Sequence, residues 1–312
     1  DTSLSYADLA MGVRVDLRAG RVRGEGVEDR VAGVSLVRGG AGEDVLRGGA
    51  RREWEGFAGG RGADRIDGRG GYDEVLYALE GAPAGVVVDL AAGRATDGWG
   101  FRDRLLRVEA VTGTAHADTL RGGGAPFESF RGLAGDDVIH GRDGADRVDH
   151  GRDAAEGGPR GVRVNLAAGR ARDGFGDRDR LRGIESAAGT EAGDRLLGDA
   201  RDNRLQGAGG RDLLRGGPGR DRLEGGPGRD RLEGGPGADV FEFARGDGRD
   251  LVRDFRPGLD RLRVAETGLA GFHELRVAET PGGLRLGFGE GDAVRLRGLA
   301  EGEVGPDEVW LL

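Results

Sequence analysis

The chain has 312 residues, of which 66 are glycine, and only 5 % are aromatic, so its length suggests two domains but its composition does not describe two ordinary globular cores. Its net charge is −9 and its arginines are mixed with acidic residues throughout, which argues against a nucleic-acid partner because no basic stripe stands apart. Cysteine is absent, and no stretch approaches the roughly 20 apolar residues of a membrane helix, so no transmembrane segment is expected.

The chain opens on a long unit that occurs three times. Nearly the same ten residues begin at Gly12 (GVRVDLRAGR), Gly85 (GVVVDLAAGR) and Gly161 (GVRVNLAAGR). Apolar residues alternate in each copy, as at Val86 and Val88, so each copy predicts a half-buried strand that ends in a glycine turn. Downstream of each copy comes an Asp-Arg-apolar step, which begins at Asp29, Asp103 and Asp179.

Glycine-rich nonapeptides follow in the first two copies, and each carries an aspartate as its sixth residue. They are GGAGEDVLR from Gly39, GGRGADRID from Gly59, GRGGYDEVL from Gly68, GTAHADTLR from Gly113, GLAGDDVIH from Gly132 and GRDGADRVD from Gly141. The segments 51–58 and 124–131 break this register, and we expect bulges or small loops there.

The third copy carries nonapeptides in unbroken phase. Six units begin at Gly189, Gly198, Gly207, Gly216, Gly225 and Gly234. Their sixth residues are Asp194, Asn203, Asp212, Asp221, Asp230 and Asp239, and their eighth residues are five leucines and Phe241. A short period repeated in this way indicates a solenoid.

Each nonapeptide predicts a tight turn followed by a brief strand. Glycines at the first, second and fourth positions permit positive φ angles, so the first six residues curl with their carbonyl oxygens inward. The last three residues form a strand whose middle, apolar side chain points into the solenoid. Two units make one turn, so loops of neighbouring turns stack about 4.8 Å apart and enclose carbonyl oxygens and two carboxylates. An all-oxygen site of this kind suits Ca²⁺.

An aspartate in a glycine-rich turn also has a simpler use, which is to cap its own backbone. Capping alone does not require the same side chain in six consecutive units, with a large apolar residue two positions later. The repetition therefore favours a cation site.

The pattern resembles the RTX (repeats-in-toxin) calcium-binding nonapeptide GGxGxDxUx, in which U is a large apolar residue. The resemblance implies an all-β fold, a parallel β-roll with several Ca²⁺ ions between successive turns and a β-rich C-terminal tail. The implied ligand pairs are Asp194 with Asp212, Asp212 with Asp230, and Asp221 with Asp239, with a weaker site where Asn203 faces Asp221. The less regular units add the candidate ligands Asp44, Asp64, Asp73, Asp118, Asp137 and Asp146.

Arginine occupies position five or seven of several units, where the family's loops are usually acidic or neutral. Arginine heads that point outward would be solvated, whereas heads that lean over an ion would lower its affinity, and the sequence leaves both open. These residues are Arg211, Arg220, Arg222, Arg229 and Arg231.

The tail from Glu242 to Leu312 differs from the repeats. FEFARGDGRDLVRDFRPGLDRLRV resembles the segment that ends many RTX arrays in proteins exported by bacterial type I secretion. This resemblance implies an ABC exporter as partner and a secreted, extracellular protein, with or without attachment to the cell surface. ELRVAETPGGLRLGFGEGDAVRLRGL then predicts strands joined by tight turns. Asp247, Asp250 and Asp254 fit either a terminal cation site or ordinary loop carboxylates.

The sequence divides into repeat blocks 1–84, 85–160 and 161–242, followed by a cap and secretion-signal region at 243–312. No catalytic motif is present: HELRV at His273 lacks the second histidine of a zinc-protease helix, and there is no Gly-x-Ser-x-Gly elbow or P-loop. We therefore expect no enzyme within this chain.

Two interpretations of function remain. The first is a non-catalytic β-roll that folds on binding Ca²⁺ outside the cell, with any surface or polysaccharide contact left undefined. The second is the C-terminal module of a larger secreted enzyme, such as a serralysin-type protease or an alginate epimerase. The first residue is Asp1, and we expect that further sequence precedes it.

Overall fold

Short strands joined by glycine-rich turns make up the computed structural model, which describes residues 2–49, 54–265, 269, 271–289 and 291–311. The chain divides into unit 1 (Asp1–Arg147 and Arg178–Ile184) and unit 2 (Val148–Asp177 and Glu185–Leu312), which are taken separately. In the described residues, helix is confined to the short 3₁₀ turns η1 (Ala78–Glu80) and η2 (Phe272–Glu274), so the all-β prediction is confirmed. Within these same ranges, the structure contains no helix with the length and apolar character of a membrane span.

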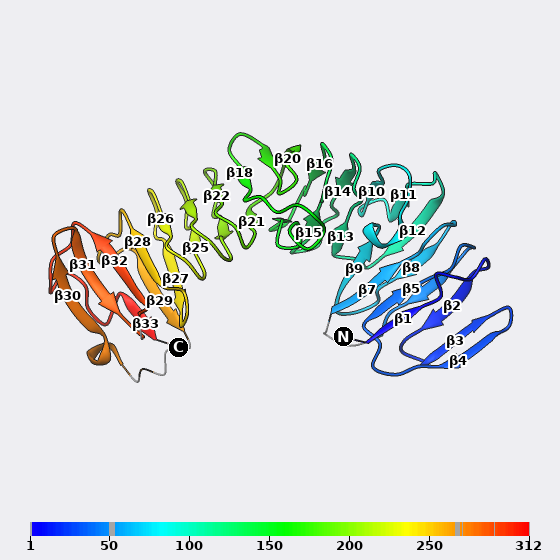
Figure 1. The fold of residues 1–312 in the computed structure, drawn as a ribbon, viewed down its shortest axis with the longest axis horizontal. Helices are drawn as coiled ribbons and strands as arrows, with labels where there is room; N and C mark the ends of the chain where they lie inside the picture. Colours follow the sequence, from blue (N-terminus) through cyan, green and yellow to red (C-terminus); the bar gives the residue numbers. More distant parts are fainter. Residues whose placement is uncertain (1, 50–53, 266–268, 270, 290, 312) are drawn as a thin grey trace. The chain divides into compact units, whose positions relative to one another are not determined.

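Unit 2 contains the regular nonapeptides, whose strands alternate between two parallel sheets (Figure 1). The first sheet is formed by β18 (Arg163–Asn165), β22 (Arg195–Leu197), β24 (Leu213–Arg215), β26 (Arg231–Glu233), β28 (Arg249–Val252) and β32 (Ala293–Arg297). The second is formed by β21 (Ser186–Ala188), β23 (Arg204–Gln206), β25 (Arg222–Glu224), β27 (Val240–Ala244), β29 (Arg261–Ala265) and β33 (Val309–Leu311). Consecutive strands thus lie in opposite sheets, which confirms a turn built from two nonapeptides.

The apolar residue at position eight of each nonapeptide forms the core of this roll. Leu196 pairs in register with Leu214, and Leu214 with Leu232, and all three side chains are fully buried. Leu205 and Leu223 do the same in the opposite sheet. Because side chains alternate across a strand, the residues on either side of each leucine point outward. One leucine-sized side chain per nonapeptide is therefore the main apolar contribution to the core.

Unit 1 repeats this plan with less regular spacing. One parallel sheet is formed by β1 (Ser3–Ser5), β5 (Leu36–Arg38), β7 (Trp54–Ala58), β9 (Tyr72–Leu76), β13 (Ala110–Thr112) and β15 (Ser129–Arg131). Opposite it lie the parallel series β2 (Val13–Asp16), β6 (Val45–Arg47), β8 (Arg65–Asp67) and β12 (Arg102–Leu106), and β10 (Val87–Asp89), β14 (Thr119–Arg121), β16 (Val138–His140) and β20 (Arg178–Arg182). Strand β17 (Arg147–Asp149) spans the boundary between the two units.

The recurring ten-residue segment folds as an antiparallel insertion at the edge of the roll. β2 pairs with β3 (Arg21–Gly24), which pairs with β4 (Val27–Arg30), and β10 pairs with β11 (Arg94–Thr96). In unit 2, β18 pairs with β19 (Arg170–Arg172) in the same way. Val13 and Val15 are buried and Arg14 is exposed, so the alternating pattern correctly predicted a half-buried strand.

Two local expectations have different outcomes. The expected small loop is present at 124–128, whereas 54–58 and 129–131 form the regular strands β7 and β15 instead of bulges or loops; residues 51–53 lie outside the described residues. The expectation of hairpins in the tail is confirmed, since β30 (Arg276–Thr280), β31 (Gly283–Gly287) and β32 form an antiparallel sheet.

Candidate metal centre

Each nonapeptide loop packs its aspartate against its own first glycine. A Cβ atom on Gly207 would lie 2.3 Å from Asp212 Oδ2 and 2.6 Å from the carbonyl oxygen of Gly225 in the next loop on the same edge. The equivalent point at Gly189 lies 2.1 Å from Asp194 Oδ2 and 2.7 Å from the carbonyl oxygen of Gly207. Carboxylate and carbonyl oxygens of successive turns therefore converge where only glycine leaves room.

The aspartates of successive turns form a ladder through their backbones. In unit 2 the amide of Asp194 donates to Asp212 Oδ1 (2.7 Å), and that of Asp212 donates to Asp230 Oδ1 (2.8 Å). The amide of Asp230 continues the ladder to Asp250 Oδ1 (2.9 Å). Opposite, the amide of Asn203 donates to Asp221 (2.8 Å), Asp221 to Asp239 (3.0 Å) and Asp239 to Asp260 (3.1 Å).

The second carboxylate oxygen has no partner at four positions of these ladders. The Oδ2 atoms of Asp212, Asp221, Asp230 and Asp250 are buried and accept no hydrogen bond. Each of these residues is at most 4 % exposed. A buried acceptor without a donor is costly, and a buried charge more so, unless a counter-charge is present. The residues therefore fit a bound hard cation, which would be matched by these oxygens.

Burial makes these carboxylates hard to ionise without a counter-ion. It raises the pKa of Asp212 to about 8 and that of Asp250 to about 8, and neighbouring carboxylates add to both shifts. It raises the pKa of Asp221 to about 7 and that of Asp230 to about 6. A nearby cation would favour the charged form and reverse these shifts.

The first aspartate of each block is bound differently. Asp194 accepts from the amides of Val162 (2.6 Å) and Thr190 (2.6 Å), so both of its oxygens have donors. Asp44 accepts in the same way from Val13 and Gly40, and Asp118 from Val86 and Thr114. The recurring strand thus caps the start of each ladder, and these three carboxylates are satisfied by the chain itself.

In unit 1 the ladders are completed by residues that the sequence did not mark as ligands. The amide of Asp44 donates to Asp64 (2.8 Å), and that of Asp64 donates to Asp103 (3.0 Å). The amide of Asp118 donates to Asp137 (2.8 Å), and that of Asp137 to Asp179 (3.1 Å). Asp103 and Asp179 come from the Asp-Arg-apolar steps. A leucine two positions later, as in the nonapeptide, is the signal that could have identified them.

Two glutamates take the place of aspartate in the irregular loops. Glu55 accepts from the amide of Gly49 (2.7 Å), and Glu128 accepts from that of Gly123 (2.8 Å). At the corresponding place in unit 2, Asn203 accepts from the amide of Asp199 (2.7 Å). The longer side chain reaches its loop from two residues further along the chain at Glu55 and from one residue further at Glu128, so the nine-residue register hides both. The two predicted ligands next to these loops, Asp73 and Asp146, are buried on the same edges of unit 1.

The five arginines at positions five and seven do not enter the ladders of the described residues. Four are exposed, and Arg222 is half-buried against Glu242. Their heads therefore lie on the outer surface. This resolves the question in favour of solvated arginines.

Among the described residues, no three His, Asp or Glu side chains gather as a metal-binding group. Any ion between turns would be held by two carboxylates together with backbone carbonyl oxygens, which is the composition that the stacked loops offer. The two tail carboxylates differ. Asp250 extends one ladder, whereas Asp254 accepts from the amides of Gly234 (3.0 Å) and Gly235 (2.8 Å) through its two oxygens.

A sequence comparison identifies the loops that carry these ladders. The profile of the RTX calcium-binding nonapeptide repeat matches residues 32–50, 57–75, 128–154, 189–223 and 215–250. These segments are RTX repeats. They include every predicted ligand except Asp118, which lies between two of the matched segments.

Comparisons over longer stretches give weaker likenesses. No curated protein sequence matches the chain. The extracellular lipase LipA from Serratia marcescens is 21% identical over 65% of this chain and 40% of the lipase chain, with a TM-score of 0.33. The AlgE6R3 subunit of the Azotobacter vinelandii mannuronan C5-epimerase is 32% identical over 38% of this chain and 78% of that chain, with a TM-score of 0.33. This chain therefore spans 40% of the length of the lipase that it matches.

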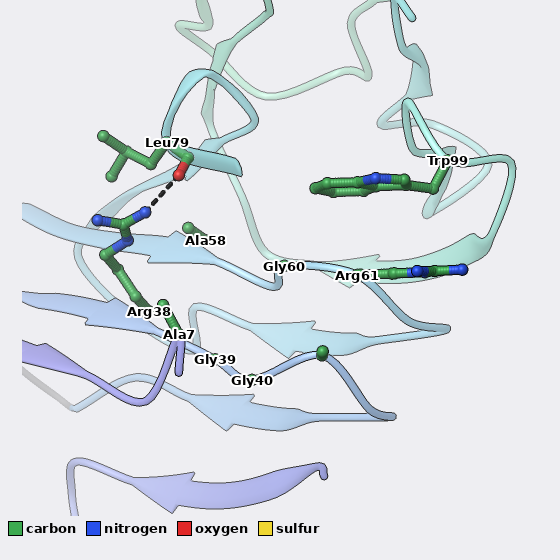
Figure 2. Close-up of a pocket in the computed structure, with 10 residues that line it drawn as sticks. Ala7, Arg38, Gly39, Gly40, Ala58, Gly60, Arg61, Leu79 and Trp99 are labelled. Atoms are coloured by element: carbon green, nitrogen blue, oxygen red, sulfur yellow. Dashed lines mark hydrogen bonds between the residues drawn. The ribbon is translucent and has the colours of Figure 1, made fainter. Parts of the chain in front are cut away.

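A shallow cavity lies beside the RTX loops of unit 1 (Figure 2). Arg38 reaches across it and donates to the carbonyl oxygen of Leu79, and Trp99 stands over the opposite side near Arg61. Its other lining residues are glycine and alanine, and among the residues that the structure describes the lining includes no carboxylate, histidine, serine or threonine side chain.

Proposed function

We propose that this chain is a calcium-dependent β-roll that folds when it reaches Ca²⁺ outside the cell. The observation that carries the proposal is the row of buried carboxylate oxygens without donors at Asp212, Asp221, Asp230 and Asp250. All four residues lie in segments that match the RTX calcium-binding nonapeptide repeat, which supplies the family context.

The residues would act together as follows. The stacked loops bring carboxylates and carbonyl oxygens of successive turns to the same points, and the glycines keep those points open. Bound Ca²⁺ would supply the positive charge that these oxygens lack. Each nonapeptide buries little more than one leucine-sized side chain, which offsets only part of the entropy of ordering nine residues. The free energy of ion binding would therefore become free energy of folding.

The dependence of folding on Ca²⁺ also suggests how the chain is exported. Extracellular calcium modules typically have dissociation constants of about 10⁻⁴–10⁻³ M, so such a site would stay empty in the cytosol and fill outside. We propose that the unfolded chain passes a type I ABC exporter by its C-terminal region and is secreted as a non-catalytic module. A role as the C-terminal module of a larger secreted enzyme is the alternative, and the gene sequence upstream of Asp1 distinguishes the two.

The test compares the chain in chelator and in millimolar Ca²⁺. We expect a large hydrodynamic radius and a disordered far-ultraviolet circular dichroism spectrum in chelator, and a compact β-rich chain in Ca²⁺. A chain that is compact and fully β-structured in chelator at neutral pH would contradict the proposal, even if it bound Ca²⁺.

A further inference from the structure

The last loop of the roll contains an arginine where the three nonapeptides before it contain glycine, at Gly217, Gly226 and Gly235. Residues 255–263, FRPGLDRLR, align with the nonapeptide Gly234–Glu242, GGPGADVFE, so Arg256 occupies position two and Asp260 position six. The amide of Asp239 donates to Asp260, as expected for successive members of a ladder. Residues 255–260 therefore resemble a final, altered nonapeptide loop that follows the matched segments.

The guanidinium of Arg256 lies among the oxygens of the loop before it. Its Nη2 atom donates to the carbonyl oxygens of Gly235 (2.6 Å) and Gly237, and lies 3.4 Å from Asp239 Oδ2 and 3.3 Å from Asp260 Oδ1. The carboxylates of Asp239 and Asp260 are at most 1 % exposed. One positive charge thus contacts two carbonyl oxygens and two carboxylates from successive turns.

The preceding turn on the same edge lacks this feature. Asp221 Oδ2 is buried without a donor, whereas Asp239 Oδ2 is contacted by Arg256. Within the described residues, no guanidinium donates to the carbonyl oxygens of Gly217 or Gly219, the counterparts of Gly235 and Gly237. The turn of Asp239 therefore already contains a positive charge from a side chain, whereas the turn of Asp221 does not.

The same position carries arginine in two other RTX loops. Arg69 and Arg142 are second in their nonapeptides, and they donate to the carbonyl oxygens of Gly48 (2.9 Å) and Gly122 in the preceding loops. Each also pairs with an aspartate of the recurring strand, which is Asp16 for Arg69. Arginine at position two therefore reaches back over the previous loop wherever it occurs in this chain.

We infer that Arg256 takes the place of a calcium ion at the last interloop site, between Asp239 and Asp260. The inference rests on the proposed calcium binding of the other turns. The end of the roll then carries a cation that is part of the chain itself, so this site stays filled whatever the Ca²⁺ concentration. The final turn then stays closed at low Ca²⁺ and offers a preformed edge on which the preceding turns can stack.

Calorimetric stoichiometry tests this inference with matched variants of the full chain. Arg256→Gln removes the charge, and we expect it to bind one more Ca²⁺ ion than the unsubstituted chain. Arg256→Lys keeps a positive charge and should gain no ion. Arg253→Gln is the control in the same segment and should leave the ion count unchanged. Arg253 lies 3.9 Å from Glu233 and, within the described part of the chain, contacts no ladder carboxylate.

Hydrogen exchange provides a second readout. In chelator, the amides of residues 234–239 should be protected in the unsubstituted chain and unprotected in Arg256→Gln, and saturating Ca²⁺ should restore them. A folded Arg256→Gln variant with an unchanged ion count would overturn the inference, as would a variant that fails to fold in saturating Ca²⁺. If the unsubstituted chain binds no Ca²⁺, the proposed function fails separately.

Discussion

At the scale of single residues, the ladder carboxylates that look alike in the sequence have different surroundings. Asp194 accepts hydrogen bonds from the amides of Val162 and Thr190 through its two oxygens, because the recurring strand lies beneath it. Asp212 accepts from Asp194 through Oδ1, and its Oδ2 has no donor. The second aspartate therefore has coordination capacity that the first has already used.

Conversion of one carboxylate into an uncharged carboxamide, by an Asp→Asn substitution, tests this difference. Asp212→Asn should lose two Ca²⁺ ions, because Asp212 stands between Asp194 and Asp230 in the ladder and borders two interloop spaces. Asp194→Asn should lose one ion at most, since that carboxylate already has donors from the chain. Isothermal titration of both variants measures the counts, and equal losses would contradict the distinction.

At the scale of the turn, two glycines of one loop differ in whether a side chain could replace their hydrogen. A Cβ atom on Gly68 would lie 2.3 Å from the carbonyl oxygen of Arg107 and 2.4 Å from Asp73 Oδ2. A Cβ atom on Gly70 would meet nothing within 4 Å, and this residue does not need a positive φ. Only the first glycine is required by the ladder.

Alanine substitution in this loop should therefore give two different results. Gly68→Ala should destabilise the Ca²⁺-loaded chain by about 1–3 kcal/mol, the usual cost of forcing extra atoms into a packed site. Gly70→Ala should be neutral or stabilise the chain by about 0.4–1 kcal/mol, because it restricts the unfolded state. Thermal unfolding in saturating Ca²⁺ compares the two variants, and an equal effect would show that the carboxylate contact does not control this position.

The elements that the sequence predicted well are those set by local contacts. The position-eight leucines and position-six aspartates repeat at a fixed spacing, so their strands, their sheet alternation and their ladders could be read directly, as for Asp212 and Leu214. Asp103 was missed because it lies 39 positions after Asp64 in the chain, and an antiparallel insertion separates it from the nonapeptide register. Glu55 was missed for a different reason: its longer side chain reaches the loop from outside the nine-residue register.

At the scale of the whole molecule, the stacked carboxylates couple folding to pH. Burial raises the pKa of Asp64 to about 8, that of Asp73 to about 8 and that of Asp212 to about 8. An unfolded aspartate has a pKa of about 3.9, so the metal-free folded chain binds more protons than the unfolded chain between about pH 4 and 8. The free energy of unfolding must then fall as pH rises through that window.

The ion pairs of unit 1 act in the opposite direction but in a different range. Hydrogen bonds from Arg142 lower the pKa of Asp89 to about 2, so the stability that this pair contributes is present at neutral pH and is lost only as the solution becomes strongly acidic. The two effects together place the stability maximum of the metal-free chain in mildly acidic solution. A drop from neutral pH should therefore partly replace Ca²⁺, because protons neutralise the same carboxylates.

We accordingly expect the chain in chelator to gain β-structure and resistance to urea between pH 8 and pH 5. The affinity for Ca²⁺ should depend on pH in the opposite sense. The apparent affinity should rise from pH 6 to pH 8, because ligation releases the protons that buried carboxylates hold in the metal-free state. Circular dichroism at matched ionic strength measures the first effect, and calorimetry in two buffers of different ionisation enthalpy measures the proton release. Asp212→Asn combined with Asp250→Asn removes two of the titrating groups and should flatten both curves. Metal-free stability that increases from pH 5 to pH 8 would show that burial does not raise the pKa values of these carboxylates above those in the unfolded chain.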